Sequence, residues 1–327
     1  MRRSILMRAT ALAGLLSAIG LLGSANAQEQ PFPSRPIKLV VPYPPGAAID
    51  NMARGFAQEF AKKIKTPVVI ENKPGAGTAI AALAVKSAPA DGYTLMFQTE
   101  NFLIAKLANP QLDYKASDFE TITPLAKTSY TLIVPGQHNL RTLADLKAHA
   151  ARKGNELDFG SLGMGPSMYN VLGTALSRQL GVKANMVPYK GGMEALNAVM
   201  AGEIDGLFST VSTSYTHKDN PRLHNLALAS DGSRNPFFPD LRSFKDLGVK
   251  DVVFYSLFGI TIRADTPEVV KKTLKEVARH VADSEELKRY RRQISLEDYT
   301  GTLAEFDTDT KNAIEMLQKA YEQEQKR

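Results

Sequence analysis

The chain has no cysteine and no tryptophan among its 327 residues. Without cysteine there is neither a disulfide framework nor a site for lipid attachment, so the stability of the fold has to come from a buried core. Hydrophobic residues make up 43% of the chain. At this length we expect about two domains, and two domains imply a cleft.

The net charge of the chain is also small. The 40 basic and 34 acidic residues leave a formal charge of +6, and three of the arginines fall within residues 1–27. The basic residues are spread along the chain, apart from Lys288–Arg292, which we interpret as the solvated face of a helix. A nucleic-acid partner is therefore not expected.

The N-terminus is typical of a signal peptide. Basic residues precede an uncharged apolar run, residues 9–23, which ends in the small-residue motif Ala25-Asn26-Ala27. The run is shorter than the roughly 20 residues that cross a bilayer. We expect cleavage after Ala27 and export to the periplasm by the Sec or the twin-arginine route.

Short apolar runs alternate with helical patterns along the rest of the chain, which predicts an α/β fold with mostly parallel sheets flanked by helices. The predicted strands are residues 37–41, 68–70, 94–97, 131–134, 157–159, 185–188 and 206–208. The predicted helices are residues 49–64, 79–86, 167–180 and 193–200, together with helices that start near Thr142, Thr266 and Thr302. Thr142 with Asp145, and Thr302 with Glu305, have the spacing of a capping box.

The last part of the chain is expected to return to the first domain. Residues 251–263 form one long extended run, and a helix start follows it. We predict crossovers near residues 126–134 and 252–262, which act as a hinge. Residues 28–130 and 255–327 then form domain I, and residues 131–254 form domain II.

Two glycine-rich loops stand between a predicted strand and a predicted helix, residues 42–50 and residues 160–167. Ligands of open α/β sheets bind beyond the carboxyl ends of strands, where helix N-termini attract negative charge. Two such loops facing one cleft favour a carboxylate or a phosphate ligand. The alternative is that the glycines only form tight turns.

The order of short motifs along the mature chain resembles the Bug-type solute receptors of tripartite tricarboxylate transport systems. These motifs are Pro33–Ile37, Val41–Gly46, Val69–Gly77, Asp91–Leu95, Asp118-Phe119, Val187–Gly191 and Gly202–Asp205. The resemblance implies a type II periplasmic binding protein with two domains and two hinge crossovers. It also implies capture of a small carboxylated molecule and its delivery to a membrane transporter.

By this resemblance the loops 43–48 and 161–168 hold a ligand carboxylate. The chain departs from the family at Ala47, Tyr169, Ser209 and Leu257, which affects specificity. Asp50 either orients the ligand or complements the N-terminus of its helix. The expected ligand-binding residues are Tyr43, Gly46, Ala47, Ala48, Asp50, Thr99, Glu100, Ser161, Gly163, Met164, Ser167, Met168, Tyr169, Tyr189 and Ser209.

Glu100 follows a strand end where the family tends to have small neutral residues. A carboxylate there repels a second anionic group on the ligand. With aromatic candidates nearby, Tyr169, Tyr189, Phe208 and Tyr215, we predict a monocarboxylate with an apolar or aromatic body and a polar or cationic donor group. The alternative is that Glu100 points to solvent or pairs with a lysine.

An enzyme is not expected, because the five histidines show no metal-binding spacing and there is no cysteine nucleophile. We predict no catalytic residue, no metal and no cofactor, and a monomer. Two alternatives stay open: a ligand-sensing protein that signals to a membrane sensor, and a periplasmic hydrolase.

Overall fold

The computed structural model describes residues 32–162 and 167–325. The signal peptide predicted for residues 1–27 lies outside these ranges. Residues Arg35–Arg327 form one compact unit. None of the helices in the described ranges is long and apolar enough to cross a membrane.

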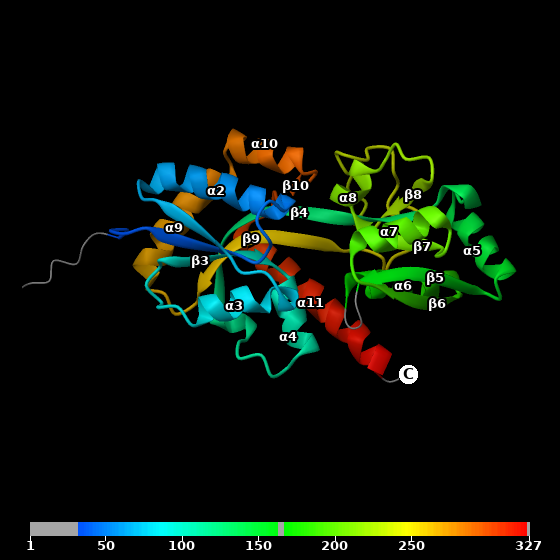
Figure 1. Ribbon diagram of the computed structural model, residues 1–327, viewed down its shortest axis with the longest axis horizontal. Helices are drawn as coiled ribbons and strands as arrows, with labels where there is room; N and C mark the ends of the chain where they lie inside the picture. Colours follow the sequence, from blue (N-terminus) through cyan, green and yellow to red (C-terminus); the bar gives the residue numbers. More distant parts are fainter. Residues whose placement is uncertain (1–31, 163–166, 326–327) are drawn as a thin grey trace, which may run out of the picture. The chain divides into compact units, whose positions relative to one another are not determined.

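A mixed sheet organises this unit (Figure 1). Its strands, in spatial order, are β2 (Val68–Asn72), β1 (Ile37–Val41), β3 (Thr94–Thr99), β9 (Tyr255–Arg263), β4 (Phe119–Pro135), β7 (Gly206–Thr210), β5 (Glu156–Leu162) and β6 (Lys183–Tyr189). The pairs β1–β2, β1–β3, β5–β6 and β5–β7 are parallel, whereas β9 and β4 pair antiparallel with their neighbours. Two further strands, β8 (Leu223–Leu228) and β10 (Glu297–Asp298), pair with β4.

Helices flank the sheet. They are α2 (Ala48–Ile64), α3 (Ala79–Lys86), α4 (Asn101–Ala108), α5 (Leu143–Arg152), α6 (Met168–Leu180), α7 (Gly192–Ala201), α8 (Val211–Thr216), α9 (Glu268–Ala282), α10 (Glu285–Gln293) and α11 (Leu303–Gln325). Helix α2 packs against α9 and α10, and α3 packs against α4. The α/β class expected from the sequence is confirmed.

Local sequence explains where the helices begin and end. In α2, Phe56 and Phe60 are one turn apart and fully buried, because the apolar residues repeat with the helical period. The helix ends at Lys65, whose left-handed conformation is common at C-caps. Thr142 and Asp145 form the capping box of α5 that the sequence predicts.

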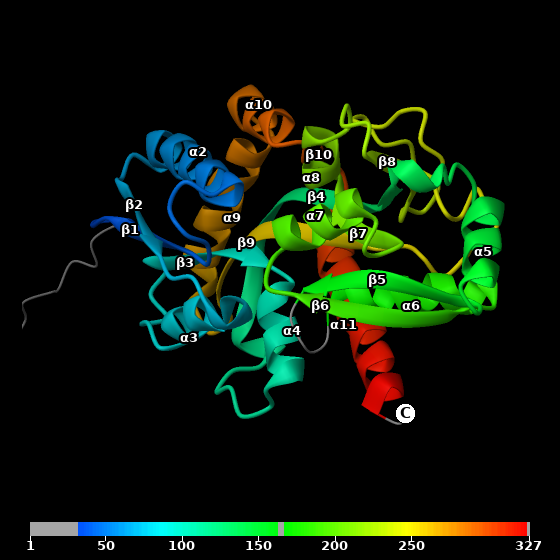
Figure 2. The same ribbon diagram turned by 45° about the vertical axis from the view of Figure 1, so that its right-hand side comes forward.

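Two long strands connect the parts of the sheet. Residues 119–129 of β4 pair with β9, and residues 130–135 of the same strand pair with β7 and β8. Figures 1 and 2 show β4 and β9 running from the region of β1–β3 to the region of β5–β7. The chain therefore passes between these regions along one continuous strand, β4, near residues 129–130.

The C-terminal helix contacts both regions. Helix α11 packs against α4 on one side and α6 on the other. Its residues Ala313 and Leu317 belong to the same hydrophobic core as Leu172 and Leu176 of α6. The chain end thus contributes to the core around β5–β7 as well as to the region of β1–β3.

Two expectations about the last part of the chain need correction. The strand β9 begins at Tyr255 rather than at residue 251, because Val252 and Phe254 are packed into the core ahead of the strand ladder. The basic run Lys288–Arg292 lies in α10, but it is not solvated throughout. Arg291 is buried, since its guanidinium donates to Asp298 and to the carbonyl oxygen of Ala282.

Candidate functional site

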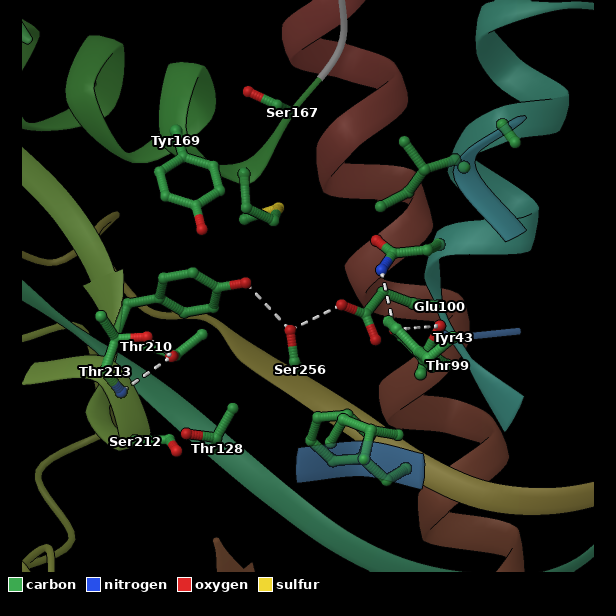
Figure 3. A pocket seen from close by; sticks show the side chains of 18 of the residues that line it. Tyr43, Thr99, Glu100, Thr128, Ser167, Tyr169, Thr210, Ser212, Thr213 and Ser256 are labelled. Atoms are coloured by element: carbon green, nitrogen blue, oxygen red, sulfur yellow. Dashed lines mark hydrogen bonds between the residues drawn. The ribbon is translucent and has the colours of Figure 1, made fainter. Parts of the chain in front are cut away.

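A pocket of about 800 Å³ opens beside the long strands (Figure 3). Its lining comes from the loop after β1, the turn η1 (Ala76–Thr78), the end of β3 with α4 and the loop after it, and the middle of β4. The start of α6, the junction of β7 and α8, β9, and residues 294 and 296 after α10 complete it. Among the described lining residues Glu100 is the only one with a charged side chain. This single carboxylate therefore dominates the electrostatics of the pocket.

Glu100 lies between β3 and α4 and is 3% exposed. Ser256 Oγ donates a hydrogen bond of 2.6 Å to Glu100 Oε1, and the backbone N–H of Leu257 donates one of 3.2 Å to Oε2. Figure 3 shows the carboxylate pointing toward Ser256. The Tyr130 hydroxyl lies 3.0 Å from Ser256 Oγ and extends the network to β4.

Burial raises the pKa of the Glu100 carboxyl, although the hydrogen bonds from Ser256 and Leu257 act in the opposite direction. The alternative position considered for this side chain, exposed to solvent, is wrong. Glu100 is held inside because β9 pairs antiparallel with the end of β3 and supplies both donors.

Tyr43 and Thr99 line the same side of the pocket as Glu100. The Tyr43 hydroxyl donates to Thr99 Oγ1 at 3.5 Å, and Asn101 Nδ2 donates to the Tyr43 hydroxyl at 3.5 Å. Burial raises the pKa of Tyr43, and the Glu100 charge contributes to the shift. Tyr43 therefore stays a neutral hydroxyl that can donate a hydrogen bond to an anion.

The N-terminus of α6 forms another wall. Ser167 is the N-cap, and its Oγ accepts from the Asn170 backbone N–H at 3.4 Å. Met168 and Tyr169 follow it in the lining. The Tyr169 ring packs edge-on against Tyr130, with 6.0 Å between the ring centroids, and burial raises the pKa of Tyr169 to about 12.

The pocket floor is rich in hydroxyl groups that the sequence did not single out. Thr128 of β4, Thr210 at the end of β7, and Ser212 and Thr213 of α8 all line it. Thr210 caps α8 through the Thr213 backbone N–H. Alternation along β4 and β7 could have suggested these positions, but only their pairing shows which faces meet.

Asp50 does not line the pocket; it holds the loop beside it. It is fully buried and accepts from the Gly46 backbone N–H at 2.8 Å, Arg54 Nε at 2.8 Å and Asn72 Nδ2 at 2.7 Å. Burial acts to raise its pKa, but the hydrogen bonds from Arg54, Asn72 and Gly46 hold that pKa below its ordinary value. Gly46 has a φ of 83°, a conformation that favours glycine.

Five further expected site residues are described but are not part of the pocket lining: Ala47, Ala48, Ser161, Tyr189 and Ser209. Ala47 is the N-cap of α2 and Ala48 its first residue, between the lining residues Tyr43 and Ile49. Ser161 and Ser209 are buried within β5 and β7, and Tyr189 ends β6. Gly163 and Met164 lie outside the described residues.

Two of the aromatic candidates are engaged elsewhere. Phe208 packs in the core beside Phe159 and Phe244. Tyr215 packs against Phe237 and Phe238 instead of the pocket. Of the four candidates, Tyr169 lines the pocket, and the rest of its aromatic surface comes from Tyr43, Tyr130 and Phe258.

A sheet whose halves share two long strands, with a pocket lined by strand-to-helix junctions from both halves, defines a solute-binding protein of the periplasmic type. The tripartite tricarboxylate transporter family receptor, TctC, matches residues 52–320. The chain belongs to this family and is a solute receptor of a tripartite tricarboxylate transport system.

Individual relatives agree with this assignment. A UPF0065 protein from the gbd 5′ region of Cupriavidus necator is 30% identical over 94% of this chain and 89% of its own length. A ligand-free TctC solute-binding protein from Polaromonas has a TM-score of 0.77 at 22% identity, covering 89% of this chain and 99% of that one. The R. palustris protein Rpa4515, solved with adipate, has a TM-score of 0.73 at 25% identity, covering 88% and 97%.

Proposed function

We propose that the pocket binds a small monocarboxylate that also carries a hydrogen-bond donor or a cationic group. The observation that carries the proposal is the buried carboxylate of Glu100 in a pocket whose described lining has no other charged side chain. A buried carboxylate favours a ligand donor, and it repels a second ligand carboxylate.

The ligand carboxylate is proposed to lie away from Glu100, near the start of α6. Ser167 and the N-terminus of this 13-residue helix offer a hydroxyl and the positive end of the helix dipole. The loop 43–48 is the second proposed contact, through the Tyr43 hydroxyl. Hydroxyls and backbone N–H groups can bind a carboxylate without lysine or arginine, and the described lining contains neither.

The body of the ligand is proposed to be apolar or aromatic. Tyr130, Tyr169 and Phe258 supply aromatic surface, and Met168 adds a thioether side chain that adapts to ring edges. A volume of about 800 Å³ accommodates a compound of this size together with ordered water.

Ligand capture is proposed to bring two domains together, residues 28–130 with 255–327 and residues 131–254. The support is that the lining comes from both sides of the two long strands. A bend near the centre of β4 and β9 would narrow the pocket without breaking the sheet elsewhere.

We further propose that the protein acts in the periplasm as a monomeric receptor without turnover. The N-terminal sequence supports export. Among the described lining residues there is no histidine, lysine or arginine that could act as a general base or a nucleophile's partner beside Glu100.

A matched pair of ligands tests the ligand class. Adipate and 6-aminohexanoate share a six-carbon chain and one carboxylate, and differ in whether the other end is an anion or a cation. We expect 6-aminohexanoate to bind more tightly at neutral pH by isothermal titration calorimetry, and to raise the melting temperature more at equal concentration. Tighter binding of adipate would overturn the proposed ligand class.

A further inference from the structure

A second cluster of polar side chains lies at the far end of β7 from the pocket. It contains His138 from the turn η3 (Gly136–His138) after β4, His149 from α5, and Asp205 just before β7. Thr210, the last residue of β7, lines the pocket, so the length of that strand separates the cluster from the pocket. No part of the proposed ligand-binding function involves this cluster.

The three side chains converge. His149 Nε2 lies 2.8 Å from Asp205 Oδ1, and the His138 and His149 rings stack with their centroids 4.8 Å apart. One ligand atom from each of the three residues lies within 4.8 Å of the others. Because the residues come from three separate elements, their spacing in the sequence gives no sign of this arrangement.

The other carboxylate oxygen of Asp205 is already fixed. Asp205 is 2% exposed, and its Oδ2 accepts from Lys153 Nζ at 2.7 Å and from the Asp158 backbone N–H at 2.8 Å. These bonds orient the carboxylate so that Oδ1 faces the histidines. Ligating carboxylates in metal sites are held by outer hydrogen bonds of this kind.

His138 supplies an independent observation. Its Nδ1 is buried and has no hydrogen-bond partner among the described residues. The other ring nitrogen, Nε2, faces Gly202, where an added Cβ would lie 3.5 Å from it. A buried ring nitrogen without a partner is unfavourable, and a bound cation would satisfy it.

We propose that His138, His149 and Asp205 form a site for a divalent transition-metal ion, with Zn²⁺ as the best fit. Two imidazole nitrogens and one carboxylate oxygen are the protein ligands of a three-ligand zinc site that keeps a fourth position for water.

Occupancy requires a small adjustment of the side chains. Zinc bonds of about 2.0–2.2 Å place tetrahedral ligand atoms about 3.4 Å apart. The His149–Asp205 pair, at 2.8 Å, therefore has to open by about 0.6 Å, and a separation of 4.8 Å has to close by about 1.4 Å. The histidine side chains have to rotate to make these changes, because Asp205 is held by Lys153 and by the Asp158 backbone N–H. The ion would fix η3, α5 and the start of β7 to one another.

The test uses the untagged protein after treatment with a chelator. We expect one Zn²⁺ per chain by isothermal titration calorimetry and a rise in melting temperature with added Zn²⁺, whereas Mg²⁺ at the same concentration has neither effect because it prefers oxygen ligands. His138→Gln and His149→Gln should each weaken Zn²⁺ binding at least tenfold.

The matched control is His280→Gln, which changes an exposed histidine of α9 outside the cluster and should bind Zn²⁺ like the wild type. Asp205 is left unchanged, because its variants would also break the bonds to Lys153 and Asp158. Melting temperatures in chelator confirm that the variants are folded. The proposal is overturned if the wild type fails to bind one Zn²⁺, or if binding survives His138→Gln and His149→Gln.

Discussion

Replacing Glu100 by glutamine removes the negative charge from the pocket and leaves the shape of the side chain almost unchanged. The amide oxygen can still accept from the Leu257 backbone N–H. The amide nitrogen can donate to Ser256 Oγ, provided that the Ser256 hydroxyl turns to donate to Tyr130, whose oxygen lies 3.0 Å away. The network therefore survives with the Ser256 hydroxyl reversed and the Tyr130 hydrogen turned away from Ser256, and the variant should fold.

The size of the effect on binding follows from the lost charge. A hydrogen bond to a charged group contributes about 1.5–3 kcal/mol, and 1.4 kcal/mol corresponds to a tenfold change in Kd. We expect Glu100→Gln to weaken the binding of 6-aminohexanoate by roughly 10- to 100-fold. Adipate should bind as well as before or better, because its second carboxylate no longer meets a buried anion.

The pH dependence gives a second measurement. Burial raises the pKa of Glu100, so the carboxylate is protonated as the pH falls through that raised pKa. The affinity of the wild type for 6-aminohexanoate should fall over the same range, whereas Glu100→Gln should show no such fall. A raised folded-state pKa also means that this group's contribution to stability is lost as the pH rises through it. The variant should thus melt no lower than the wild type at neutral pH.

The assay is isothermal titration calorimetry of both proteins with both ligands at several pH values. A folded Glu100→Gln protein that binds the two ligands with wild-type affinities would refute the reasoning, since Glu100 would not select the ligand. An equal loss of affinity for both ligands would also count against it, because that pattern indicates a distorted pocket and not a missing charge.

Three further predictions concern stability and motion. Asp50→Ala should lower the free energy of unfolding in urea by about 1–3 kcal/mol, because the donors on Gly46, Arg54 and Asn72 lose their common acceptor. A loss below about 0.5 kcal/mol would contradict this role. Ala47→Asp should keep or raise the stability of the protein, because aspartate is a better N-cap for α2 than alanine, yet its charge should prevent carboxylate binding. Ala47→Ser is the uncharged control, and normal ligand binding by Ala47→Asp would show that this loop is not part of the site. Small-angle scattering should show a smaller radius of gyration with ligand, and an unchanged radius would exclude closure.

The sequence determined most of the secondary structure because helix and strand periodicities are local. The helix predicted at residues 79–86 is α3. The capping box predicted for Thr302 and Glu305 at the start of α11 forms both of its reciprocal hydrogen bonds. The order of short motifs also predicted the receptor family, which is confirmed. It marked Tyr43, Glu100 and Ser167 for the site because they follow strands or begin helices, and all three line the pocket.

Only the tertiary structure decided which side chains meet. Ser256 is 156 residues from Glu100 and reaches it because β9 pairs with β3, a long-range contact that no local pattern encodes. The same holds for the cluster of His138, His149 and Asp205. Local sequence fixes the direction of each side chain within its own element. Burial, pKa shifts and the side chains that meet in one cluster arise from the packing of elements that are distant in the chain.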